Sequence, residues 1–295
     1  MKRFLKLMVN AVAVLMISVA CLSLTACGED VKNAKLELQI YNHSEAAFID
    51  DNYSYMNVDL YAHLAPKTCE AMVKYINEGY YNDAIIYQLN NNIMFGDLVL
   101  KGDALEILEG GKVVNIEQNA VKPTLPGEFE AGGTVGSNLK NEKGSVGLWR
   151  TYSAAAGSFT TTSGTKTGRA TWFMPTATTA SYNGYYCVFG KIDLENEDTS
   201  AVFTTLNSTF ADRDNYTSLV IYFTGEYDAN KPDQNHGLTF NCVTSEYFNE
   251  LPEEEKEQIF VAEGSQLVCY NQYTIKVANN GNGKCGAIVK GATVK

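Results

Sequence analysis

The sequence predicts one mainly β domain, either a barrel or a sandwich. Along its 295 residues, short apolar or alternating segments recur, while only two or three segments carry an apolar stripe at helical spacing. Apolar residues make up 45% and charged residues 19% of the chain, which is typical of a globular protein. Because many strands beside few helices pack as a sheet closed on itself or on a second sheet, we expect a β-rich core.

The first predicted helix has clear start and stop signals. In APKTCEAMVKYINEG (65–79), Pro66 stands at the start, Thr68 can cap the first turn, and Gly79 follows the last apolar residue. In chain order, the other predicted elements are strands over 35–42, 56–64, 84–89, 93–100, 144–149, 170–176, 185–192, 219–223 and 273–278, and helices over 199–210 and 252–260.

The N-terminus predicts export. A basic start (1–6) is followed by a short apolar run (7–20) and by the small residues of LTAC, which end at Cys27. This order is typical of a secretory signal. A transmembrane anchor is the alternative, but the apolar run is too short and too closely followed by polar residues for a comfortable span.

LTAC also resembles the lipobox of bacterial lipoproteins, in which the cysteine carries the lipid. The resemblance implies that residues 1–26 are a signal peptide, that Cys27 is lipidated, and that residues 27–34 are a tether. Residues 35–295 would then form the domain at the extracytoplasmic face of the cell membrane. Acyl chains supply the membrane affinity, so the membrane contact requires no basic patch.

Composition and motifs exclude several classes of function. The formal net charge of −11 disfavours nucleic-acid binding, which depends on neutralising phosphates. The chain contains no GxSxG, HExxH, P-loop or GxGxxG motif, so hydrolase and nucleotide-binding signatures are missing. We therefore expect no cofactor and no nucleic-acid partner, and we expect the protein to be a monomer.

The cysteines do not form a metal-binding pattern. No CxxC pair occurs, and the three histidines (His43, His63 and His236) are scattered, so we expect no metal site. Beyond the signal region the number of cysteines is odd, which leaves at least one thiol unpaired in a monomer. We expect buried thiols among Cys69, Cys187, Cys242, Cys269 and Cys285, and one disulfide between two of them is the alternative.

Four blocks of the sequence, in order, resemble the cyclophilins. LAPKTCEAMVKYINEGYYNDAIIYQL is similar to their first helix and following strand, and NNIMFGD is similar to the family's G-F-M-I-Q-G-G-D. NLKNEKGSVGLWR and TWFMPTATTASYNGYYCVFGKI are similar to the blocks that contain S-M-A-N and V-F-G. The four blocks span about residues 56–193.

The resemblance implies a closed eight-stranded antiparallel barrel capped by two helices. Residues 199–210 would be the second helix and 273–278 the last strand, preceded by an insertion at about 211–271. It also implies peptidyl-prolyl cis–trans isomerisation of a proline-containing peptide or an unfolded exported protein. The uncatalysed barrier is high because C–N resonance is lost as the bond twists. The family holds the proline ring in an apolar pocket, and an arginine donates a hydrogen bond toward the prolyl nitrogen, which favours the twisted state.

Most polar catalytic positions of the family are replaced in this chain. The arginine falls on Gln88, while Arg150 lies near the predicted groove and could supply a guanidinium. A neutral donor contributes about 0.5–1.5 kcal/mol against about 1.5–3 kcal/mol for a charged one. Replacing arginine by glutamine is therefore expected to slow the reaction roughly five- to thirty-fold. The substrate-binding positions fall on Ile93, Met94, Gly96, Trp149, Thr171, Phe173 and Tyr186, with Ser181 at the rim.

Two functions follow from this alignment. The first is an exported, lipid-anchored isomerase of weak activity that assists protein folding outside the membrane. The second is a catalytically silent cyclophilin-like module that binds peptide or protein in the proline groove. A third, unrelated possibility is a lipoprotein barrel that binds a small solute or a sugar.

Overall fold

The structure is a computed structural model. It describes residues 31–42, 47–48, 53–102, 104–130, 139–150, 168–224, 239–259, 272–279 and 286–294. The predicted signal peptide, Cys27, Cys269 and Cys285 lie outside the described residues.

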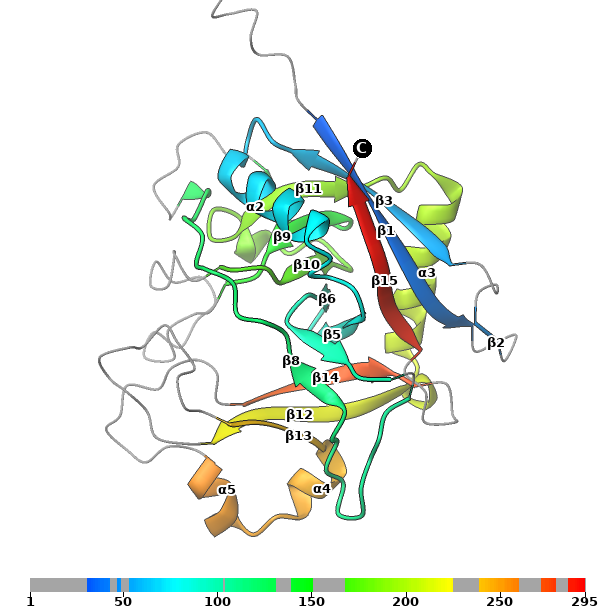
Figure 1. The fold of residues 1–295 in the computed structure, drawn as a ribbon, viewed down its shortest axis with the longest axis vertical. Helices are drawn as coiled ribbons and strands as arrows, with labels where there is room; N and C mark the ends of the chain where they lie inside the picture. The colour runs from blue at the N-terminus through cyan, green and yellow to red at the C-terminus, as the bar shows by residue number, and fades with distance from the viewer. Residues whose placement is uncertain are drawn as a thin grey trace, which may run out of the picture.

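Nine strands form a nearly closed antiparallel barrel (Figure 1). Its path runs β5-β6-β10-β9-β11-β3-β1-β15-β4. Only Ile86 separates β4 from β5, and its N–H donates to the Ala287 carbonyl at 3.0 Å, so the path returns to its start. The strands are β1 (Val31–Asn42), β3 (Ser54–Tyr61), β4 (Ala84–Ile85), β5 (Tyr87–Leu89), β6 (Asn92–Phe95), β9 (Ser145–Leu148), β10 (Trp172–Pro175), β11 (Cys187–Ile192) and β15 (Ala287–Val294).

The remaining strands extend the same sheet beyond the barrel. They are β2 (Ala47–Phe48), β7 (Leu98–Leu100), β8 (Ile116–Gln118), β12 (Tyr216–Thr224), β13 (Thr239–Thr244) and β14 (Gln272–Ala278). In the described residues the sheet has 15 strands, so the predicted count of eight is wrong. The additional strands arise because β4 also pairs with β7, and β5 also pairs with β14. β7 in turn pairs with β8, and β14 is followed in the sheet by β12 and β13.

The strand 273–278 is present as β14, but it is not the last strand. β15 follows it and pairs with β1 and β4, whereas β14 pairs with β5 and β12. A strand at the position of β15 was not predicted, because Gly291 and Lys290 interrupt its alternation of apolar and polar residues.

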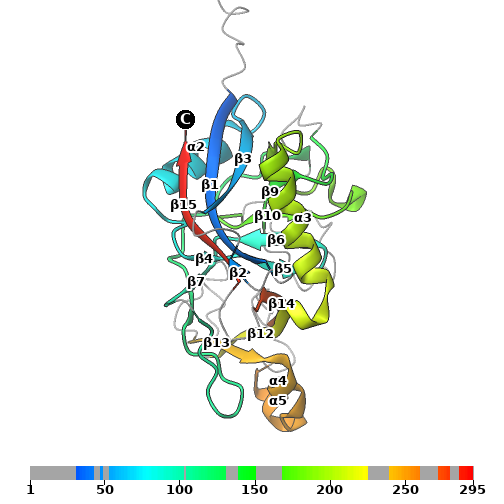
Figure 2. The same cartoon turned by 90° about the vertical axis from the view of Figure 1, so that its right-hand side faces the viewer.

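Four α-helices occur in the described residues: α2 (Pro66–Asn77), α3 (Glu197–Ala211), α4 (Ser245–Glu250) and α5 (Glu253–Ile259). The predicted helices over 65–79 and 199–210 are thus confirmed. Figure 2 shows α2 and α3 at different sides of the barrel, while α4 and α5 pack with β12 and β13 at the other end of the molecule (Figure 1). Short 3-10 turns occur at Ala180–Tyr182 (η3) and Arg213–Asn215 (η4). None of the described helices is both long and apolar enough to cross a membrane.

The N-terminus of α2 is capped from a distant segment. Glu128 is buried, and its carboxylate oxygens accept from the N–H of Lys67 at 3.1 Å and of Thr68 at 2.7 Å. A carboxylate is favourable there because it meets unpaired N–H groups and the positive end of the helix dipole. The prediction that Thr68 is the cap is wrong, since its hydroxyl lies 3.5 Å from Cys187 Sγ instead. Gly79 ends the helix as predicted, with a φ of 70°.

Two apolar clusters fill the fold. The barrel cluster lies inside the barrel and includes Ile93, Phe95, Trp172 and Met174. The outer cluster joins the outer face of β5, β6 and β10 to β7, β8, β12 and β14; it includes Tyr87, Met94, Phe173, Leu219, Ile275 and Val277. Successive residues of β6 and β10 alternate between the two clusters, as the pleat of a strand requires. The inner and outer faces of these strands are therefore both buried.

Candidate functional site

The strand register decides which predicted site residues share a face. Tyr87 pairs with Met94, and Met94 pairs with Phe173. Residues directly opposite each other in an antiparallel ladder have side chains on the same face. Tyr87, Met94 and Phe173 therefore lie together on the outer face, where the cyclophilin resemblance expects a groove.

Gln88 and Ile93 lie on the opposite face. They pair with each other, and Ile93 pairs with Met174 of the barrel cluster. Gln88 is only 8% exposed and also pairs with Lys276, whose Nζ donates to the Phe210 carbonyl at 2.8 Å. The structure thus brings Met94 and Phe173 together but does not bring Gln88 or Ile93 to them. The catalytic role of Gln88 stays a prediction.

Four rings form an aromatic group on the outer face: Trp149, Phe173, Tyr182 and Tyr186. The centroid of Phe173 lies 5.7 Å from Trp149, 5.3 Å from Tyr186 and 6.1 Å from Tyr182, in edge-on geometry each time. Trp149 stacks on Tyr186 with centroids 5.4 Å apart and planes at 26°. Phe173 and Met94 are both 0% exposed. Neither side chain is accessible to a ligand in this arrangement.

Tyr182 was not predicted as a member of this group. It comes from η3, and its ring centroid lies 4.7 Å from that of Tyr186. Its spacing of four residues from Tyr186 is a signal that could have placed both rings on one side of a turn. Gly147 provides the floor under Phe173, because a Cβ at this position would lie 2.3 Å from the Phe173 ring.

Arg150 is buried beside the aromatic group. It is 2% exposed, and its Nε donates to the Tyr185 carbonyl at 2.7 Å. The guanidinium carbon lies 5.1 Å from the centroid of Tyr186 and 5.5 Å from that of Phe129, within the range of cation–π attraction. Burial lowers the pKa of Arg150 from its ordinary value, although an arginine remains charged. Arg150 thus lies close to the predicted groove, but its guanidinium packs against Tyr186 and Phe129.

Gly96 cannot carry the side chain that the family has at this position. Its φ is 118°, and a Cβ there would lie 2.8 Å from the Ala170 carbonyl oxygen and 3.1 Å from Tyr81. The Thr171 carbonyl accepts from the Trp149 N–H at 2.8 Å, and the predicted contact of Thr171 with substrate stays a prediction. Ser181 is exposed in η3, at the edge of the aromatic group.

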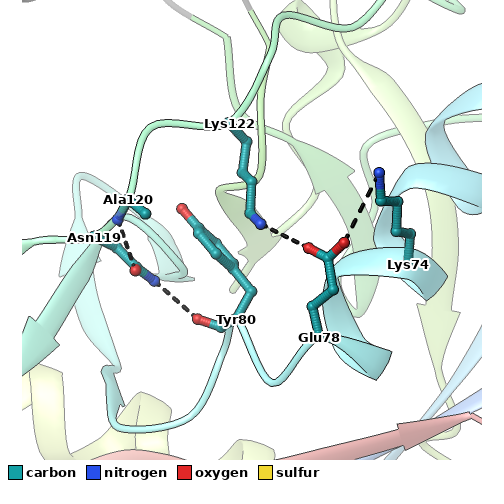
Figure 3. A network of polar contacts seen from close by, with 6 residues as sticks. All are labelled: Lys74, Glu78, Tyr80, Asn119, Ala120 and Lys122. Atoms are coloured by element: carbon teal, nitrogen blue, oxygen red, sulfur yellow. Dashed lines mark hydrogen bonds and ion pairs between the residues drawn. The ribbon is translucent and has the colours of Figure 1, made fainter.

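A polar network joins Asn119 and Lys122 to Glu78 and Tyr80, just beyond the end of α2 (Figure 3). The amide of Asn119 donates to the carbonyls of Tyr80 at 2.9 Å and Gly96 at 3.1 Å. Lys122 Nζ lies 2.8 Å from a carboxylate oxygen of Glu78 and 4.7 Å from the centroid of Tyr80. These contacts hold residues 119–122 against the Gly96 turn and the end of α2.

Tyr87 and Asp97 form a second polar feature that sequence reasoning missed. The Tyr87 hydroxyl donates to the two carboxylate oxygens of Asp97, at 2.8 and 3.0 Å. Burial raises the pKa of Asp97 to about 6, while the hydrogen bond from Tyr87 opposes this shift. Burial also raises the pKa of Tyr87 well above its ordinary value, so its hydroxyl stays protonated. The Tyr87 hydroxyl is therefore a neutral hydrogen-bond donor, and it already donates to the Asp97 carboxylate.

The described cysteines are structural. Cys69, Cys187 and Cys242 are buried and free, which confirms the prediction of buried thiols for these three. Burial raises the pKa of each thiol to about 12, which removes the thiolate needed for nucleophilic chemistry. Among the residues that the structure describes, no group of three or more His, Cys, Asp or Glu side chains could hold a metal ion.

Comparison with known proteins defines the class of this domain. The family model for cyclophilin type peptidyl-prolyl cis-trans isomerase/CLD matches residues 48–221, more than half of the chain. The chain therefore belongs to the cyclophilin-type peptidyl-prolyl cis-trans isomerase family.

Two solved structures illustrate how divergent the chain is. Both are of a cyclophilin type peptidyl-prolyl cis-trans isomerase from Cryptosporidium parvum. One, in the presence of the dipeptide Ala-Pro, has 14% identity and a TM-score of 0.35, covering 58% of this chain and 84% of that chain. The other has 13% identity and a TM-score of 0.36, covering 72% and 97%. No curated protein matches the chain.

Proposed function

We propose that this protein is an exported, lipid-anchored cyclophilin-type isomerase of weak activity that assists protein folding outside the membrane. One observation carries the proposal: Met94, Phe173 and Tyr186, which come from three separate segments, lie together in the outer cluster of a barrel that belongs to this family, with the Trp149 ring against Phe173 and Tyr186. Aromatic and thioether surfaces of this kind suit the apolar ring of proline.

The polar groups nearby support weak catalysis. The twisted peptide bond has a pyramidal prolyl nitrogen, and a donor aimed at that nitrogen stabilises the twisted state more than the planar one. Gln88 lies on the inner face, and the Nε of Arg150 is bonded to the Tyr185 carbonyl. Either donor must reorient before it reaches a peptide, and that reorientation subtracts from the stabilisation it gives.

A second function is favoured by the complete burial of Phe173 and Met94. If the rings above them never leave, the domain does not isomerise prolines and acts as a catalytically silent module that binds peptide or protein at the rim of the groove.

A protease-coupled assay separates these two functions. Residues 28–295 at micromolar concentration are expected to speed isomerisation of an Ala-Pro peptide above the rate in buffer. Arg150→Ala or Gln88→Ala is then expected to lower that rate about five- to thirty-fold, which identifies the donor. A rate equal to that in buffer would leave only the silent module, and activity unchanged in both variants would refute the assignment of the donor.

The lipid anchor is proposed from the sequence LTAC before residue 28. Cys27→Ser is expected to move the full-length protein from the membrane fraction to the soluble fraction and to abolish incorporation of labelled fatty acid. Continued labelling of the Cys27→Ser variant would show that this cysteine is not the acceptor.

A further inference from the structure

We propose that Trp149 is a gate that sets the specificity of this domain: its indole occupies the aromatic site that receives a proline ring, and peptide enters only when the indole swings out. The inference rests on the proposed function, because it names the residue that competes with substrate for the same site. It adds a reason for weak activity that is separate from the missing arginine.

The position of the indole supports a gate. Its face stacks on Tyr186, and the edge-on contact with Phe173 closes the other side. Phe173, Met94 and Tyr186 are buried, whereas Trp149 is only partly buried. The indole is thus the most exposed of the four rings, and it lies against both Phe173 and Tyr186.

Rotation of the indole requires no change in the backbone of the barrel. β9 ends at Leu148, so Trp149 lies just beyond the strand. Its backbone N–H donates to the Thr171 carbonyl at 2.8 Å, and this bond does not depend on the direction of the side chain. Rotation about the side-chain bonds therefore opens the site while the backbone keeps its place.

The space left by the indole suits an apolar saturated ring. Its walls include Phe173 and Tyr186, both from the outer cluster, to which Met94 also belongs. A space with aromatic walls favours an apolar guest over water. A pyrrolidine ring is smaller than an indole and presents C–H groups to aromatic faces, so a prolyl residue fits where the indole was.

Removal of the gate should strengthen binding and catalysis together. The contacts with Tyr186 and Phe173 are among those that hold the indole in place, and a peptide must replace both of these before it binds. The closed form therefore reduces the apparent affinity for peptide, and Trp149→Ala should raise the affinity and kcat/KM by about 5- to 100-fold. Trp149→Phe leaves a smaller ring in the site and should give a smaller gain.

The test measures binding and catalysis separately in residues 28–295. An N-capped Ala-Pro peptide is titrated into wild type, Trp149→Ala and Trp149→Phe by calorimetry, and kcat/KM is measured for each protein. Tyr53→Ala is the matched control, because Tyr53 is 41% exposed and lies outside the apolar clusters. Thermal melts establish whether each variant is folded. If Trp149→Ala does not fold, the comparison with wild type is made with Trp149→Phe alone.

Intrinsic fluorescence gives an independent readout. The chain has two tryptophans, and Trp172 is 0% exposed inside the barrel cluster. Saturating peptide is expected to shift the emission of wild type to longer wavelength as Trp149 enters water, and Trp149→Phe is expected to lose this shift.

The outcomes distinguish the gate from the proposed function. Tighter peptide binding in Trp149→Ala without any catalysis supports the gate and refutes the isomerase. Catalysis by wild type with no gain in affinity or kcat/KM in a folded Trp149→Ala refutes the gate and leaves the isomerase. Wild-type emission that does not shift with bound peptide also refutes the gate.

Discussion

Trp172→Ala is expected to lower the free energy of unfolding by about 3–5 kcal/mol, because it removes the largest ring of the barrel cluster and leaves a cavity. Trp172 is fully buried, and its centroid lies 5.2 Å from Phe95, 5.0 Å from Phe189 and 5.6 Å from Tyr81. Its indole N–H donates to the Tyr81 hydroxyl at 2.9 Å, so the substitution also removes a buried hydrogen bond. Chemical denaturation of residues 28–295 measures the loss.

Trp149→Ala is the matched control for this substitution. It removes the same side chain from a partly buried site at the edge of the outer cluster, so less apolar area is lost from the protein interior. Trp149→Ala is expected to lower the free energy of unfolding clearly less than Trp172→Ala does. Equal losses would mean that the aromatic group is as essential to folding as the barrel cluster, which contradicts the role of Trp149 as a gate.

Gly96→Gln, which restores the family's glutamine, is expected to destabilise the protein by about 2–5 kcal/mol instead of restoring activity. A φ of 118° is strained for any residue with a Cβ and costs about 1–3 kcal/mol. The new Cβ would also lie 2.8 Å from the Ala170 carbonyl oxygen, and a backbone atom cannot yield as a flexible side chain can. Thermal unfolding and the isomerase assay measure the two effects.

Gly102→Gln separates backbone strain from the steric clash. Gly102 has a similar φ of 106°, but a Cβ there would meet no atom within 4 Å. The Gly102→Gln variant is therefore expected to lose only the part of the stability that depends on the backbone conformation. If Gly96→Gln and Gly102→Gln lose the same stability, the close approach of Ala170 to Gly96 does not exist in solution.

Local signals in the sequence predict the local structure well. The apolar stripe and Gly79 place α2, and the same reasoning places α3, because both helices are amphipathic over their full length. Alternation likewise identifies β1 and β3, whose inner residues Leu36 and Val58 reach the barrel cluster. These elements depend on residues that are close together in the chain.

Features that depend on pairing could not be predicted in this way. The turn at Asn90 pairs Leu89 with Asn92, and that register puts Gln88 on the inner face and Tyr87 on the outer face. A slip of one residue would reverse both, and no local pattern in an Asn-rich turn fixes the register.

Contacts between segments that are distant in the chain could not be predicted from the sequence either. Glu128 caps α2 from about sixty positions away, and nothing near Thr68 in the sequence indicates it. The bond between Tyr87 and Asp97 joins a strand to the turn after the next strand. By contrast, Phe173, Met94, Trp149 and Tyr186 were identified in advance, because the cyclophilin resemblance places them in order along the chain.

We propose that this cyclophilin-type domain isomerises prolines weakly in part because its own Trp149 lies where the proline ring binds. Two-dimensional exchange NMR of an Ala-Pro peptide at equilibrium tests it most directly, with residues 28–295 as wild type and as Trp149→Ala. The account predicts cis–trans exchange cross-peaks with wild type, and exchange at least about fivefold faster with Trp149→Ala. An absence of exchange with both folded proteins would contradict it.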